Sequence, residues 1–198
     1  MDAHRYFILN KPYNMVSQFV SSHDVKLLGD LDFDFPDGTH AIGRLDNNSE
    51  GLLLLTTNKK ITRLLFQGEQ PHKRIYLVQV KNLVGQEALQ QLRNGIKISG
   101  KGGEDYLASS CDVAIVDPPV NLFSSGYELR REVPSTWLRI SLTEGKFHQV
   151  RKMVAAIHHK CKRLIRVSIE DMELEGLQPG EVREVDEETF FTKLKLAR

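Results

Sequence analysis

Four consecutive leucines at 52–55 constrain the fold more than any other feature of this sequence. A short apolar run bounded by polar turn residues is typical of a strand that is buried on both faces. The preceding stretch, HAIGRLDNNSEG, ends in small polar residues that favour a turn at the edge of such a strand. The pattern predicts a strand over 51–57, and it predicts that Arg44 and Asp46 are fixed on a rigid element just before it.

The other periodic segments predict an α+β fold with a mostly antiparallel mixed sheet flanked by helices, because no regular strand–helix–strand rhythm is present. Further strands are expected over 5–9, 40–44, 74–80, 96–99, 111–116, 136–143 and 163–169, with a short hairpin over 176–185. Helices are expected over 59–67, 85–94 and 147–159, and irregular loops over 20–39 and 117–133. With 198 residues the chain can form one domain over 1–198, or two small α+β halves with a boundary near residue 70.

Composition excludes several classes of protein. No segment approaches the roughly 18 to 20 apolar residues of a membrane helix, and the first apolar run is too short for a secretion signal, so a cytoplasmic protein is expected. Cys111 and Cys161 have no CxxC partner, which favours two reduced thiols. The seven histidines are scattered, and the adjacent pair His158 and His159 lacks the spacing of a helical metal site. We predict no metal.

Charge is segregated along a chain whose net charge is only +1. Residues 139–166 carry eight lysines and arginines against the single acid Glu144, whereas residues 170–189 carry nine acids against Arg183 alone. A basic stripe of this kind suits contacts to RNA phosphates. A solvated helix face would have the same composition, so the stripe alone leaves both interpretations open.

The acidic residues around the leucine run allow two other hypotheses. Asp46, Asn48, Glu50 and Gly51 match positions 1, 3, 5 and 6 of a calcium loop, but position 12 is Thr57 and the flanks are predicted strands, so calcium is rejected. Asp46 and Glu50 could also form the carboxylate pair of a glycosidase, although two acids four residues apart are a weak signal.

The stretch GRLDNNSEGLLLLTTN resembles the catalytic motif of pseudouridine synthases of the RsuA family. The resemblance continues in order through NKP, KRIYLVQV, LTEGKFHQVRKM, RLIRV and LQPGEVREV. The text PSTWL at 134–138 favours the synthase E branch, which acts on large-subunit ribosomal RNA. These segments cover nearly the whole chain and leave no room for the small N-terminal S4 RNA-binding domain of many relatives.

The resemblance implies a role for each matching residue. Asp46 is implied to be the catalytic carboxylate, and Arg151 the neighbouring cation that keeps it ionised. Arg44 is implied to fill the space left by the flipped nucleotide, while Tyr76 and Leu164 are implied to enclose the uracil from two sides. The reaction is an isomerisation, so the resemblance implies no cofactor.

The expected partner is ribosomal RNA, as a structured stem containing the target uridine, bound by a monomer and without a membrane. The RNA contacts are expected to be Lys11, Lys146, His148, Lys152 and Arg166. The chain departs from the family at Glu170, where glycine is usual. Two rival hypotheses remain: a catalytically inactive RNA-binding protein of the same fold, and a glycoside or nucleoside hydrolase that releases free base.

Overall fold

The computed structural model describes residues 3–66, 68, 70–100, 102–125 and 133–197. The chain divides into two compact units. Unit 1 comprises residues 1–72, 123–126 and 165–198, and unit 2 comprises residues 73–122 and 127–164. The chain therefore leaves unit 1 after His72, returns to it for four residues from Phe123, and returns to it again at Ile165, in the middle of one strand.

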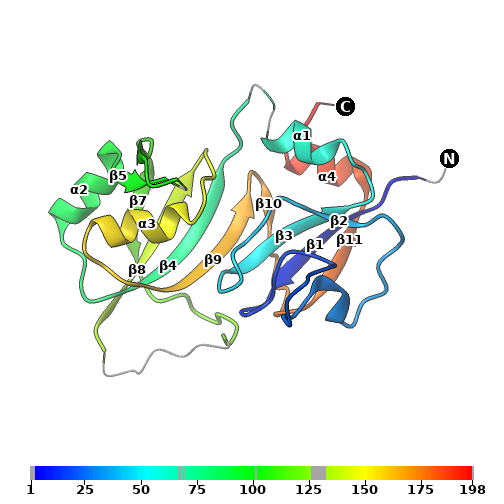
Figure 1. Ribbon diagram of the computed structural model, residues 1–198, viewed down its shortest axis with the longest axis horizontal. Helices are drawn as coiled ribbons and strands as arrows, with labels where there is room; N and C mark the ends of the chain where they lie inside the picture. Colours follow the sequence, from blue (N-terminus) through cyan, green and yellow to red (C-terminus); the bar gives the residue numbers. More distant parts are fainter. Residues whose placement is uncertain (1–2, 67, 69, 101, 126–132, 198) are drawn as a thin grey trace. The chain divides into compact units, whose positions relative to one another are not determined.

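The sheet of unit 1 is ordered β11-β1-β3-β9, with β2 paired to β3 and β10 paired to β9 (Figure 1). The strands are β1 (Tyr6–Lys11), β2 (His40–Ile42), β3 (Glu50–Thr56), β9 (Cys161–Ile169), β10 (Met172–Glu173) and β11 (Val182–Val185). All pairs are antiparallel except β3 with β9, which run parallel where Glu50 faces Ile165 and Gly51 faces Arg166. The expected mixed, mostly antiparallel sheet is confirmed in this unit.

The leucine run lies on β3 and is buried on both faces of the sheet, as predicted. Leu52 and Leu54 pack into one core, together with α1 (Ile61–Phe66) and α4 (Glu187–Lys193). Leu53 and Leu55 pack into a second core on the opposite face, which includes the 3₁₀ turn η1 (Leu28–Asp30). Each fully buried leucine contributes about 1.5–3 kcal/mol relative to an exposed one, so the burial of β3 strongly stabilises unit 1.

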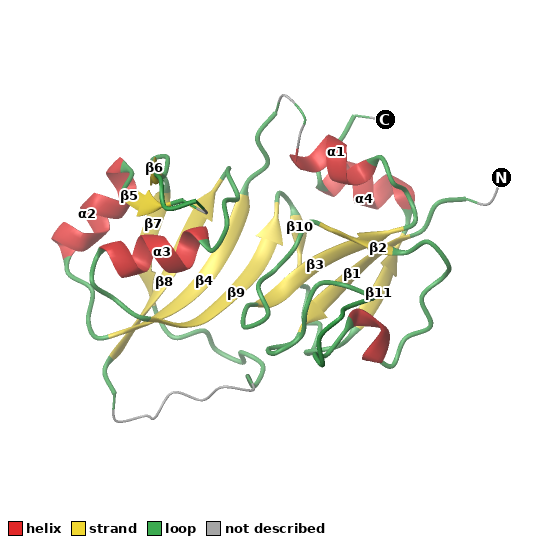
Figure 2. Cartoon of the chain, viewed as in Figure 1, coloured by secondary structure: helices red, strands yellow, loops and turns green. Residues whose placement is uncertain are grey.

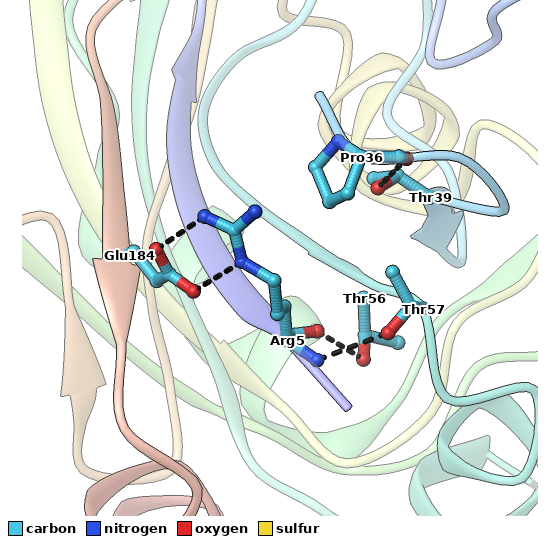
Figure 3. A network of polar contacts seen from close by, with 6 residues as sticks. All are labelled: Arg5, Pro36, Thr39, Thr56, Thr57 and Glu184. Atoms are coloured by element: carbon cyan, nitrogen blue, oxygen red, sulfur yellow. Dashed lines mark hydrogen bonds and ion pairs between the residues drawn. The ribbon is translucent and has the colours of Figure 1, made fainter. Parts of the chain in front are cut away.

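Polar contacts fix the start of β1 between its two neighbours (Figure 3). The Nε and Nη2 atoms of Arg5 each donate to a carboxylate oxygen of Glu184 on β11, at 2.7 Å. The Arg5 backbone N–H donates to Thr57 Oγ1, and its carbonyl accepts from Thr56 Oγ1. The expected local hairpin over 176–185 is wrong, because β11 pairs with β1 at the edge of the sheet.

Unit 2 contains strands ordered β9-β4-β8-β7, of which β4, β8 and β7 pair antiparallel. Its strands are β4 (Arg74–Lys81), β7 (Asp112–Val116), β8 (Ser135–Leu142) and the first residues of β9, with a separate hairpin of β5 (Lys97–Ser99) and β6 (Asp105–Leu107). The helices α2 (Gln86–Asn94) and α3 (Gln149–Ala156) cover one face of the sheet (Figure 2). As predicted, Tyr76, Val78 and Val80 of β4 lie on one side, and Val150, Met153, Val154 and Ile157 form the buried stripe of α3.

Two predicted elements need correction, and two observed elements were not predicted. Helix α3 begins at Gln149 instead of 147, because His148 adopts a left-handed conformation with φ 54°. Helix α4 and strand β6 were not predicted, although Asp186 caps α4 by accepting from the Thr189 N–H at 2.8 Å. The predicted strand over 40–44 ends early, at Ile42.

Other predicted features are confirmed or lie outside the described residues. Cys111 and Cys161 are both half-buried thiols. Residue 67 of the predicted first helix and residues 126–132 of the predicted loop lie outside the described residues. In the part of the chain that the structure describes, no helix is both long and apolar enough to cross a membrane.

Replacing Leu53 with alanine tests the double-sided burial of β3. The side chain is fully buried, so the L53A variant should lose about 2–5 kcal/mol of unfolding free energy. Urea denaturation measures this loss. The control is Val20→Ala, which removes an apolar side chain that is 78% exposed and should change stability by less than about 0.5 kcal/mol. Equal losses of unfolding free energy in the two variants would contradict the conclusion that burial of β3 stabilises the protein.

Candidate functional site

Asp46 lies in the loop between β2 and β3, and this loop also contains Arg44, the last residue of the strand predicted over 40–44. The strand ends because Gly43 adopts φ 70°, where a Cβ atom would lie 2.5 Å from the Phe66 ring. Beyond it, Arg44 is exposed, Leu45 is buried and Asp46 is half-buried. Two opposite charges therefore flank one anchored apolar side chain.

The backbone of this loop is fixed by a second loop that follows β1. The Ser17 hydroxyl accepts from the Leu45 N–H and donates to the Leu45 carbonyl, both at 3.0 Å. The Asn47 side-chain amide donates to Asn14 Oδ1 at 3.1 Å, and the Asp46 carbonyl accepts from the Ser49 N–H at 2.9 Å. Asp46 thus lies between two hydrogen-bonded neighbours. Ser17 and Asn14 could not be identified from the sequence, because no local pattern links them to partners about thirty positions away.

Lys11 joins the same two loops from the inside. Its side chain is fully buried, and its ammonium donates to the carbonyls of Pro12 (2.9 Å), Met15 (2.6 Å) and Asn47 (3.3 Å). An ammonium in this position is directed into the protein, whereas a phosphate contact requires an accessible one. The position of Lys11 therefore fits a structural role and not the RNA contact expected from the sequence.

Arg166 is the other expected RNA contact that the structure places in the interior. Its side chain is 3% exposed, and its Nε donates to the Leu52 carbonyl at 2.8 Å. Opposite it, Gly51 adopts φ 100°, and a Cβ atom there would lie 2.3 Å from the Arg166 carbonyl oxygen. The close approach of β3 and β9 explains why the turn after Asp46 ends in glycine.

Three further candidate residues belong to unit 2. Tyr76 of β4 and Leu164 of β9 are 9% and 5% exposed and share the core of that unit. Arg151 projects from α3 and is half-buried, and its Nη1 lies 3.6 Å from the sulfur of Cys161 at the start of β9. The structure thus brings an aromatic residue, an aliphatic residue and a guanidinium onto elements that pack together in unit 2.

The three remaining RNA candidates gather before and within the first turn of α3. Lys146 lies over the Tyr106 ring at 5.2 Å, and Lys152 donates to the Ser99 carbonyl at 2.7 Å. His148 is the residue that precedes the helix. Unlike Lys11 and Arg166, Lys146 is exposed, as a phosphate contact requires.

Glu144 fixes this end of α3 to the β5–β6 hairpin. Its carboxylate accepts from the Tyr106 hydroxyl, from the Ser109 N–H at 2.9 Å and from the Gln149 amide. Burial alone would raise the pKa of Glu144, but these hydrogen bonds outweigh it and lower the pKa below its ordinary value. The hydrogen bond to Glu144 also raises the pKa of Tyr106 to about 12.

The chemistry available to these residues is that of a carboxylate, guanidinium groups and a phenol. In the ranges that the structure describes, no three His, Cys, Asp or Glu side chains are grouped as metal ligands. Asp46 is the acidic side chain presented by the anchored loop, next to the exposed cation Arg44. This arrangement suits covalent or acid–base chemistry at a carboxylate.

Comparison with known proteins gives consistent similarities. Residues 5–156 match the family model described as RNA pseudouridylate synthase. The chain is 35% identical over 174 residues to ribosomal large subunit pseudouridine synthase E of Xanthomonas axonopodis pv. citri, covering 87% of this chain and 89% of that protein. It is 36% identical to the protein of the same name in Vibrio vulnificus, covering 91% and 75% of the two chains. A solved structure described as a pseudouridylate synthase superposes with a TM-score of 0.79 at 27% identity, over 98% of this chain and 75% of that one.

Substituting Gly51 with alanine tests the close approach at the turn. The positive φ and the contact with the Arg166 carbonyl should together destabilise the protein by about 2–4 kcal/mol. Chemical denaturation measures the change. Gly29→Ala is the matched control, because its nearest neighbour lies 4.0 Å away and its φ is not positive. A stable G51A protein would show that the turn tolerates a side chain.

The hydrogen bonds of Glu144 predict a pH dependence of stability. A lowered folded-state pKa stabilises the protein above the ordinary value of 4.5, and this contribution is lost as the pH falls through the folded pKa. Glu144→Gln should therefore cost about 1–2 kcal/mol at pH 7, and the difference from wild type should close below pH 4.5. Denaturation curves from neutral to acidic pH measure it; a difference that does not vary with pH would contradict the assignment.

Proposed function

This chain belongs to the RNA pseudouridylate synthase family, and on that premise we propose that it isomerises uridine in large-subunit ribosomal RNA to pseudouridine. The observation that carries the proposal is the 35% identity to the Xanthomonas synthase E over most of both chains. The family predicted from the sequence motifs is therefore confirmed.

In this reaction Asp46 acts on the ribosyl carbon that bears the uracil. The bond from that carbon to N1 breaks, the uracil turns within the site, and a bond to C5 forms; C5 gives up a proton and N1 gains one. Atoms and electrons balance within the nucleotide, so the chemistry needs no oxidant or energy source. An ionised carboxylate is the active form, and its anchored loop limits the positions that it can adopt.

The other site residues are proposed for substrate binding, each on its own chemistry. Arg44 is an exposed cation two residues from Asp46, suited to support RNA from which a nucleotide has been flipped. Tyr76 offers a planar ring for the base, and Leu164 an apolar contact. Arg151 offers a half-buried guanidinium on α3.

The RNA-binding role is proposed for Lys146, His148 and Lys152, and no longer for Lys11 and Arg166. The exposure of Lys146 and the position of all three around the start of α3 support it. A structured RNA stem as substrate, a monomeric state and a cytoplasmic location stay predictions from the sequence.

The two rival hypotheses differ in their products. An inactive RNA-binding protein needs the basic residues alone, and it would leave the uridine unchanged. A hydrolase would release free uracil. The fixed loop around Asp46 favours an enzyme, since binding phosphates does not require a positioned carboxylate.

Replacing Asp46 with asparagine tests the reaction directly. The change removes the ionisable carboxylate at constant shape, so turnover should fall by more than about 1000-fold while folding and RNA binding remain near wild type. Pseudouridine mapping in transcribed large-subunit ribosomal RNA measures turnover, and assay of free uracil tests the hydrolase. Asp24→Asn, at an exposed position, is the control. Substantial pseudouridine formation by D46N would rule out the role of Asp46.

A further inference from the structure

An exposed aromatic side chain lies among the proposed RNA contacts of unit 2. Phe147 is 54% exposed and lies between Lys146 and His148, just before α3. Phenylalanine is among the residues most often buried in proteins, and the sequence motifs give Phe147 no role. Its exposure makes the ring available to a ligand that stacks on an aromatic face.

The Phe147 ring is supported by its neighbours. The ring of His148 stacks on it, with centroids 3.9 Å apart and an interplanar angle of 16°. The Lys152 ammonium lies 5.3 Å from the Phe147 centroid and is itself held by the Ser99 carbonyl of β5. The ring is thus part of an ordered arrangement on α3 and the adjoining hairpin.

The left-handed conformation of His148 is what brings the two rings together. With φ 54° at His148, the chain turns sharply before the helix begins. Glu144 fixes the other end of this turn through Tyr106, Ser109 and Gln149. A turn held at both ends presents Phe147 with little loss of conformational entropy on binding.

The charge around Phe147 favours an anionic ligand. Within the described part of the chain, neither Lys146 nor Lys152 forms an ion pair with a carboxylate. The nearby acid Glu144 is occupied by its hydrogen bonds to neutral donors. An aromatic ring flanked by cations is the arrangement that binds single-stranded nucleic acid, because bases stack on the ring while phosphates contact the cations.

We propose that Phe147, backed by His148, is a stacking platform for an unpaired base of the RNA substrate, with the adjoining phosphates bound by Lys146 and Lys152. The inference rests on the proposed function and adds a single-stranded element to its substrate. A purely apolar protein partner fits less well, because the Lys152 ammonium lies over the ring and Lys146 precedes Phe147 in the sequence.

The test uses the full-length Asp46→Asn protein, in which binding is measured without turnover. The probes are a short single-stranded RNA carrying one fluorescent adenine analogue and a blunt duplex of the same sequence. Stacking should quench the analogue. Phe147→Ala should remove the quenching and weaken single-strand binding by about 5- to 100-fold, with little effect on the duplex.

Two conservative variants and a control separate stacking from other contributions. Phe147→Trp should retain binding and quenching, whereas Phe147→Leu, which stays apolar, should lose them. Phe147→Ala should not change how steeply the logarithm of the RNA-binding constant falls with the logarithm of the salt concentration. Lys152→Ala should reduce this slope by about one unit, because one phosphate contact is lost. Leu83→Ala, at a side chain 76% exposed elsewhere in unit 2, should have no effect.

Three results would overturn the platform: unchanged single-strand binding by F147A, full binding by F147L, or an equal loss on the duplex. Circular dichroism confirms that each variant is folded. Pseudouridine formation by the wild-type protein is measured separately, so quenching without turnover would contradict the proposed function and leave the platform intact. Pseudouridine formation without quenching would contradict the platform and leave the proposed function intact.

Discussion

The burial of β3 on both faces is the constraint on which the rest of unit 1 depends. Because alternate leucines enter two different cores, a shift of one residue in register would exchange every side chain between them. The register with β1, from Tyr6 opposite Thr56 to Lys11 opposite Gly51, is therefore fixed. The register fixes where β3 begins, and it therefore also limits the position of the preceding turn and of Asp46.

A buried cation then connects this strand pair to the site loop. Removing the Lys11 ammonium from water is costly unless its donors are satisfied, and three backbone carbonyls accept from it. Two of these carbonyls belong to the loop after β1, and the third belongs to Asn47, the residue after Asp46. Because Lys11 is at a fixed position on β1, its hydrogen bonds hold both loops in place. A lysine that bound phosphate would not hold these loops.

The sequence predicted the elements whose signals are local. The leucine run, the alternating segment at 74–80 and the apolar stripe of α3 each contain their own periodicity, and all three were assigned correctly. The pairing of β11 with β1 was missed, because the partners are about 175 residues apart and no local pattern identifies an edge strand. The same limit applies to Ser17, whose hydroxyl binds both backbone groups of Leu45.

In the candidate site, the type of a residue did not predict whether its side chain is exposed to a ligand, because exposure depends on where the residue lies in the fold. Lys11, Arg166 and Lys152 are all cations in basic or motif segments, and each donates to a backbone carbonyl of its own unit. Lys11 and Arg166 are nevertheless buried, whereas Lys152 is half-buried at the start of α3. A sequence shows charge but not the direction of a side chain, which is set by whether its strand or turn faces a core. Phe147 shows the converse: this apolar residue is exposed just before the left-handed residue His148, where Glu144, from the segment after β8, accepts a hydrogen bond from the Gln149 amide. Which side chains are exposed at this end of unit 2 therefore depends on the backbone conformation, and composition does not reveal that conformation.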